Sequence, residues 1–130
     1  MQAAKVKDFM AANLITLSPE MEVMQAISIL LKNRISGAPV IDTMDNMVGI
    51  LSEKDCLKVA LEAGYNEGRG GKVSDYMSNK VATVNAEDSI IDIAKMFIET
   101  PFKRFPVIDD NRLVGQISRR DALKAIDTLL

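Results

Sequence analysis

Histidine is absent from this chain of 130 residues, and cysteine occurs once, as Cys56. Without histidine the chain lacks the commonest general base at neutral pH and the commonest metal ligand, and Ser–His and Cys–His nucleophile pairs are excluded. A single cysteine excludes a disulfide framework within the chain and argues against a structural zinc site. These absences favour a binding protein over an enzyme. They also fit a reducing compartment, so we expect a cytoplasmic location.

An excess of charge of one sign is missing as well, because the formal net charge is −2. Proteins that hold nucleic acid through their overall charge carry a basic excess, so a nucleic-acid partner is not expected. Arg119-Arg120 is the best local basic candidate, and it stands without a wider basic run. No apolar run is long enough to cross a bilayer, and the first ten residues lack the apolar stretch of a signal peptide. We therefore expect no membrane partner.

What the sequence does contain is an internal repeat. The run VKDFM at 6–10 returns as VSDYM at 73–77, an offset of 67 residues, and PVID at 39–42 returns at 106–109. After one residue is lost in a turn, an offset of 66 pairs Ser52 with Ser118 and Asp55 with Asp121. We predict a first repeat over residues 1–62, a glycine-rich linker over 63–72 and a second repeat over 73–130.

The sequence pattern of each repeat predicts the element order β-α-β-β-α, so we expect an α+β fold. A short extended segment (14–17, then 81–84) leads into a helix with a broad apolar stripe, and two β-rich runs around an Asp/Asn turn then predict a hairpin. A final helix begins at Glu53 or Arg119. The stripes are wider than a one-sided surface helix needs, which indicates burial against the strands and against another helix. We therefore expect the two copies to pack with pseudo-two-fold symmetry.

The sulfur-containing side chains are interpreted as packing residues. Cys56 aligns with Ala122 of the second repeat, and a small buried residue fits both positions, so we favour core packing over redox sensing. Met24, Met47 and Met96 fall at apolar positions of the pattern and are placed in the core.

The pattern Ser-x-x-Asp starts each final helix, as Ser52 to Asp55 and as Ser118 to Asp121. One interpretation is a capping box, in which the serine caps the helix and the aspartate reaches back to the backbone. The other is a ligand site, because a helix N-terminus suits phosphate and a carboxylate one turn in can accept both hydroxyls of a ribose. The two are compatible, and the sequence leaves both open. A catalytic carboxylate pair is not favoured, since neighbouring cations would keep both groups ionised.

With these residues in place, the chain resembles a pair of CBS domains, a family named after the regulatory region of cystathionine β-synthase. The resemblance covers nearly the whole chain, and two motifs in tandem make it specific. It is carried by Met10, Ile15-Thr16, Ala38-Pro39-Val40-Ile41-Asp42, Val48-Gly49-Ile50-Leu51-Ser52 and Asp55, and by Met77, Thr83, Phe105-Pro106-Val107-Ile108-Asp109, Val114-Gly115, Ser118 and Asp121.

The resemblance implies a non-catalytic regulatory module without a cofactor. Its ligand would be an adenosine-containing molecule such as AMP, ADP, ATP or S-adenosylmethionine, held in clefts between the repeats. In such modules the Asp of the motif holds the ribose, the Ser lies near the ribose or phosphate, and the segment before the Pro-Val strand of the other repeat touches the adenine. Carried over by position, one cleft combines Ile35, Ser36 and Gly37 with Ile117, Ser118, Arg120 and Asp121, and the other combines Phe102, Lys103 and Arg104 with Ile50, Ser52, Lys54 and Asp55.

The resemblance also implies partners. A conformational change would pass the signal to a regulated protein that the sequence does not identify, and helix packing would produce a homodimer. The alternative is a structural homodimerisation module whose ligand clefts are vestigial.

Overall fold

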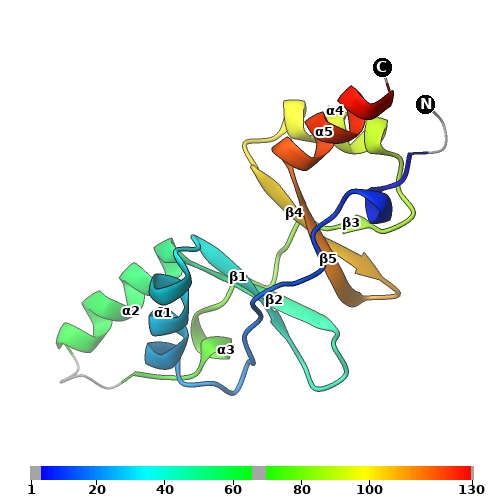
Figure 1. The fold of residues 1–130 in the computed structure, drawn as a ribbon. Helices are drawn as coiled ribbons and strands as arrows, with labels where there is room; N and C mark the ends of the chain where they lie inside the picture. Colours follow the sequence, from blue (N-terminus) through cyan, green and yellow to red (C-terminus); the bar gives the residue numbers. More distant parts are fainter. Residues whose placement is uncertain (1–3, 66–69, 130) are drawn as a thin grey trace. The chain divides into compact units, whose positions relative to one another are not determined.

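The computed structural model describes residues 4–65 and 70–129, and it is a mixed α+β structure (Figure 1). The chain forms two compact units. The first, here called the central unit, is the continuous stretch Ile15–Val81. The second, here called the split unit, combines Met1–Leu14 with Ala82–Leu130.

The central unit is a helix, a hairpin and two further helices. Its helix ends where Arg34 takes a left-handed conformation (φ 54°) and donates its backbone N–H to the last turn. The hairpin strands are antiparallel, and in their turn Asp42 Oδ1 accepts from the backbone N–H of Met44 and Asn46, which fixes the reversal. The elements are α1 (Val23–Asn33), β1 (Gly37–Ile41), β2 (Met47–Ser52), α2 (Glu53–Tyr65) and α3 (Val73–Tyr76).

The split unit repeats this plan with one more strand. Its sheet has the order β3-β4-β5, with β3 parallel to β4 and β4 antiparallel to β5. Ser89 caps the helix α4, because its hydroxyl oxygen accepts from the N–H of Ile91 at 3.2 Å. The elements are η1 (Val6–Asp8), β3 (Val84–Asn85), α4 (Ile90–Glu99), β4 (Arg104–Asp109), β5 (Arg112–Ser118) and α5 (Arg119–Leu129).

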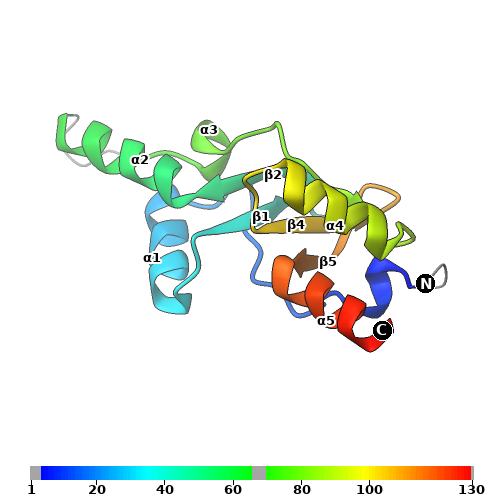
Figure 2. The same cartoon turned by 90° about the horizontal axis from the view of Figure 1, so that it is seen from above.

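Each unit has its own hydrophobic core between its strands and its pair of long helices. The helices α1 and α2 pack beside one another, as do α4 and α5 (Figure 2). Fully buried apolar side chains fill both cores, with Leu17, Leu51 and Val73 in the central unit and Ile90, Phe105 and Ile117 in the split unit. The burial of these side chains is the main stabilising contribution in each unit.

We call residues 4–11 and 71–78 the opening segments. Each compact unit contains the opening segment that belongs to the other sequence repeat. In the split unit the N–H of Val6 donates to the carbonyl of Asp88 at 2.9 Å, and in the central unit the N–H of Val73 donates to Met21 at 2.9 Å. These two bonds are equivalent under the repeat, so the compact units and the sequence repeats divide the chain differently.

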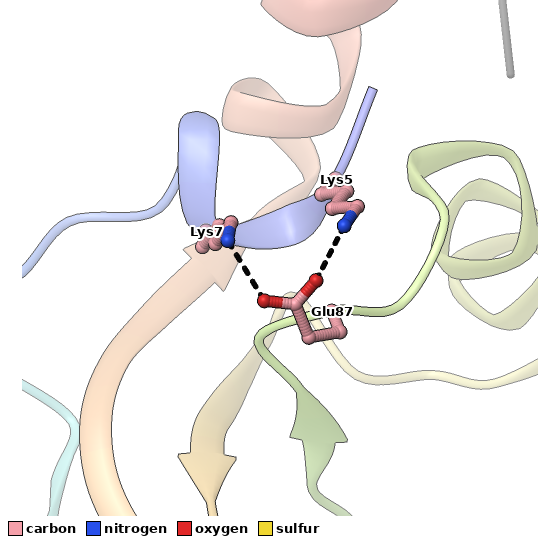
Figure 3. Close-up of polar contacts among 3 residues, drawn as sticks. All are labelled: Lys5, Lys7 and Glu87. Carbon is pink, nitrogen blue, oxygen red and sulfur yellow. Dashed lines mark hydrogen bonds and ion pairs between the residues drawn. The ribbon is translucent and has the colours of Figure 1, made fainter. Parts of the chain in front are cut away.

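Ion pairs accompany this docking in both units. Glu87 lies between Lys5 and Lys7 of the opening segment, with its carboxylate oxygens 2.6 and 2.8 Å from the two ammonium nitrogens (Figure 3). In the central unit Lys72, the equivalent of Lys5, pairs with Glu20, the equivalent of Glu87, at 2.7 Å. The ion pair is therefore present at equivalent positions of both units.

Several expectations from the sequence can be compared with this structure. The two apolar-striped helices and both hairpins are present. The final helix of the first repeat continues to Tyr65, beyond the boundary at 62, and residues 66–69 of the expected linker lie outside the described residues. Of the extended segment expected at 14–17, only Leu17 pairs with a strand, at Val40. The domain boundaries and the pseudo-two-fold packing stay predictions.

The placement of Met24 in the core was wrong. Met24 is 48% exposed and lines the open groove between α1 and α2. Met47 and Met96 are half-buried, and Met96 packs against the core of the split unit. Cys56 is also half-buried and packs against the core of the central unit.

Candidate functional site

The first Ser-x-x-Asp motif lies where β2 turns into α2. The backbone N–H and the hydroxyl of Ser52 both donate to Asp55 Oδ2, each at 2.9 Å, and the N–H of Asp55 donates back to Ser52 Oγ at 3.2 Å. This reciprocal pair is a capping box, so the capping interpretation of the motif is confirmed. It fixes the side chain of Asp55 at the start of the helix.

The second motif repeats this geometry where β5 turns into α5. The N–H of Ser118 donates to Asp121 Oδ2 at 3.0 Å, and the N–H of Asp121 donates to Ser118 Oγ at 3.1 Å. In both motifs the bonds from described residues fall on Oδ2, and both aspartates are only half-buried. Each cap therefore leaves Oδ1 of its carboxylate available to another donor.

In each unit, the segment before the Pro-Val strand contacts the helix start that carries the Ser-x-x-Asp motif of that unit. The N–H of Glu53 donates to the carbonyl of Ser36 at 2.8 Å, and the N–H of Arg119 donates to the carbonyl of Lys103 at 3.0 Å. The central unit thus brings Ser36 and the neighbouring Gly37 to its motif. The split unit brings Lys103 and the neighbouring Arg104 to its own, so the second helix start has the more basic surroundings.

The remaining predicted ligand residues are distributed as follows. Exposed side chains are those of Lys54, Phe102 and Arg120, whereas Ile35 and Ile50 are half-buried. The ring of Phe102 makes an edge contact with Phe105, with centroids 5.8 Å apart. The two predicted clefts each join residues of different units, and that combination stays a prediction.

Ile117 differs from this expectation because it is completely buried in the core of the split unit. Its equivalent under the repeat is Leu51, which is buried in the same way, whereas the equivalent of Ile50 is Gln116. Ile50 and Gln116 are both half-buried, and both exchange backbone hydrogen bonds with an opening segment, at Ser78 and Ala11. Gln116 is therefore the positional equivalent of Ile50 under the offset of 66, and the ligand role assigned to Ile117 stays a prediction.

The electrostatics of the first helix start disfavour nucleophilic chemistry there. Burial raises the pKa of the Cys56 thiol above its ordinary value, and the negative charges of Asp55 and Glu53 raise it further. The thiol is consequently protonated at neutral pH, which is the less reactive form. Within residues 4–65 and 70–129, no group of three acidic, cysteine or histidine side chains is placed to hold a metal ion.

Two apolar grooves lie on the helices of the units. The α1–α2 groove has a volume of about 460 Å³ and includes Leu31 and Leu57, which are 71% and 67% exposed. The α4–α5 groove has a volume of about 420 Å³ and includes the equivalents of these residues, Ile98 and Leu123, which are 84% and 66% exposed. Large exposed apolar side chains grouped in this way are typical of a surface that another molecule covers. None of the helices in the described residues has the length and apolar character needed to cross a membrane.

Comparison with known proteins gives consistent matches. The CBS domain family model matches residues 6–62 and 73–128. An inosine-5'-monophosphate dehydrogenase of Methanocaldococcus jannaschii is 32% identical over 121 residues, which are 92% of this chain and 23% of that protein. The uncharacterized protein MJ1225 of the same organism is 27% identical over 93% of this chain and 42% of its own length. The chain thus spans less than half of either relative.

A solved structure matches over almost its entire length. It is the crystal structure of CBSX2 from Arabidopsis thaliana in complex with AMP, which is 30% identical to this chain and has a TM-score of 0.81. The match covers 98% of this chain and 98% of that one. The similarity therefore includes both repeats and both helix starts described above.

Proposed function

Because this chain belongs to the CBS domain family, we propose that it is a non-catalytic regulatory module that binds an adenosine-containing ligand. The candidate ligands are AMP, ADP, ATP and S-adenosylmethionine, and the proposed module uses no cofactor. AMP has the most direct support, since CBSX2 was crystallised in complex with it. The ligand would lie in clefts between the repeats, with its ribose at one of the two motif aspartates.

The observation that carries this proposal is the available Oδ1 on each capping aspartate. The cap holds the carboxylate in place through Oδ2, so the side chain is oriented before any ligand arrives. Two vicinal hydroxyls of a ribose can then donate to a carboxylate that needs no rearrangement. The exposed Lys54 and Arg120, one residue before each aspartate, supply positive charge for a phosphate.

The two ligand sites are proposed to differ. Each segment contacts the helix start of its own unit through its backbone, and in the proposed clefts it also meets the motif of the other repeat: Ser36 and Gly37 would contribute to the cleft of Asp121, whereas Lys103 and Arg104 would contribute to the cleft of Asp55. The Asp55 cleft would have more positive charge, so it should prefer ligands with more phosphate groups. S-adenosylmethionine carries no phosphate, and it should favour the cleft with Ser36 and Gly37.

The test is calorimetric titration of the full chain with AMP, ATP and S-adenosylmethionine. Asp55→Ala and Asp121→Ala each remove a charged hydrogen-bonding partner, so each should weaken binding at its own cleft by about 10- to 150-fold. Asp75→Ala and Asp88→Ala are matched controls, because these aspartates accept backbone N–H bonds at 2.9 Å, from Lys72 and Asn85, outside the two motifs. The controls should bind like the parent. Equal losses in all four variants would assign the motif aspartates to helix capping alone.

A second candidate is a structural homodimerisation module with vestigial clefts, which the capping bonds and the apolar grooves favour. The absence of heat with all three ligands on the parent chain would support it over the sensor. Both candidates include a homodimer built through the exposed faces of the helices. The sensor also requires a separate regulated protein, which would respond to a conformational change on ligand binding, and a cytoplasmic location remains part of the proposal.

A further inference from the structure

Methionine occurs at one pair of equivalent positions in the two repeats, Met10 and Met77, which are related by the offset of 67. The other methionines have a different residue at the equivalent position, such as Ile91 for Met24. Both members of the pair lie near the end of an opening segment, directly before the residue that exchanges backbone hydrogen bonds with the hairpin. The same thioether is therefore present at the same contact of both units.

Each of these two sulfur atoms lies against a buried glycine of the hairpin. A Cβ at Gly115 would be 2.7 Å from Met10 Sδ, and a Cβ at Gly49 would be 2.7 Å from Met77 Sδ. Both methionines pack against the core of their unit, and both are half-buried. The thioether thus fills the space between the opening segment and the hairpin, while part of the residue stays exposed to small molecules in the solvent.

We propose that Met10 and Met77 are oxidation sites, at which hydrogen peroxide releases the opening segments from the hairpins. The sulfur lone pair attacks one oxygen of the peroxide, an S–O bond forms and the O–O bond breaks. The displaced hydroxide takes the proton of the transferred oxygen and leaves as water. The sulfur is oxidised by two electrons to a sulfoxide, and the peroxide is reduced by the same two electrons. This modification is independent of the proposed nucleotide ligand.

The sulfoxide does not fit the place that the thioether occupies. Its oxygen is a polar acceptor, and burying such a group without a donor costs free energy. The nearest backbone donors are already used, because the N–H groups of Ala11 and Gln116 donate to each other's carbonyl oxygens. Those of Ser78 and Ile50 do the same in the central unit. The oxidised side chain should therefore turn toward water and withdraw its opening segment from the hairpin.

The test is hydrogen exchange of the full chain before and after treatment with hydrogen peroxide, with peptide mass spectrometry to locate the sulfoxides. Once Met10 and Met77 are oxidised, the amide hydrogens of Ala11 and Ser78 should exchange faster by about tenfold or more, because a buried polar group without a partner disfavours the closed contact. Methionine sulfoxide reductases should restore the original protection. A loss of protection that these enzymes do not reverse would contradict the proposal.

Two variants separate this pair from the other methionines. Met10→Leu combined with Met77→Leu keeps apolar side chains of similar volume, so it should fold, and its protection should survive peroxide. Met44→Leu is the matched control, because Met44 is 64% exposed in the turn between β1 and β2, outside the opening segments. This control should respond to peroxide like the parent.

Three results would overturn the proposal. The first is a parent chain in which Met44 is oxidised while Met10 and Met77 are not, since their sulfur atoms would then be inaccessible. The second is unchanged protection at Ala11 and Ser78 after both sulfoxides have formed. The third is an equal loss of protection in the leucine double variant, which would assign the effect to another methionine.

Discussion

Glu87 shows how a single exposed side chain can tie an opening segment to its unit. Hydrogen bonds from Lys5 and Lys7 lower the pKa of its carboxyl group from 4.5 to about 2. In the unfolded chain the carboxyl binds a proton at its ordinary pKa, so the folded chain binds fewer protons between these values. The stabilising contribution is therefore complete above about pH 4.5, and it is lost as the pH falls toward 2.

We expect Glu87→Gln to lower the urea midpoint of unfolding at pH 7 and to leave it unchanged near pH 2. Glu99→Gln is the control, because Glu99 is an exposed glutamate of the same unit that lies on α4, away from the opening segment. The measurement is urea unfolding of the parent and both variants across this pH range. A difference for Glu87→Gln that persists at pH 2 would contradict the linkage.

The roles of single residues were predictable where the motif itself defines them. The Ser-x-x-Asp spacing predicted the cap at Asp55 and at Asp121, since three residues along a helix start bring the two side chains together. Ile117 is buried whereas Ile50 is half-buried, because a shift of one residue along a strand moves a side chain to the opposite face. The deletion in the hairpin turn causes that shift, and Gln116 takes the position equivalent to Ile50.

At the scale of elements, two glycines permit the opening segments to lie directly on the hairpins. A Cβ at Gly115 would be 2.7 Å from the carbonyl oxygen of Ala11 and 2.7 Å from the sulfur of Met10. At Gly49 it would meet Met77 and Ser78 just as closely. Glycine is required at these positions because the backbone of another segment occupies the space of a side chain.

Gly115→Ala should therefore destabilise the split unit, by about 1–3 kcal/mol as in overpacked cores. The exchange of the amide hydrogens of Ala11 and Gln116 should also become faster, because these residues bond to one another across the contact. Gly70→Ala is the control, since its Cβ would lie at an ordinary 3.4 Å from Met24. Thermal unfolding and hydrogen exchange test this, and unchanged protection at Ala11 would show that the segment adapts without cost.

The predictability of elements depended on their length. The apolar stripes from Val23 and Ile90, and the PVID runs before an Asp turn, were long enough to indicate helices and hairpins. The opening segments are too short to show a period, so the short helices η1 (Val6–Asp8) and α3 (Val73–Tyr76) were recognised only as a repeated sequence and not as helices. Their docking is a long-range contact, which a local pattern does not encode.

At the scale of the whole molecule, the split unit depends on both ends of the described chain. Removing residues 1–11 should destabilise the body that includes 82–129, although these residues lie far away in sequence. The central unit is continuous over Ile15–Val81 and should keep its stability. Hydrogen exchange resolved by residue tests this, and uniform loss of protection in both units would instead indicate that they unfold together.

The exchange of opening segments also bears on how a gene of this kind can be inherited. A gene fragment for a single repeat would encode a unit without the opening segment that completes its fold. Deleting either copy would remove most of one unit and leave the other unit without its opening segment. The two halves are therefore expected to be retained together, because each unit includes residues from both repeats.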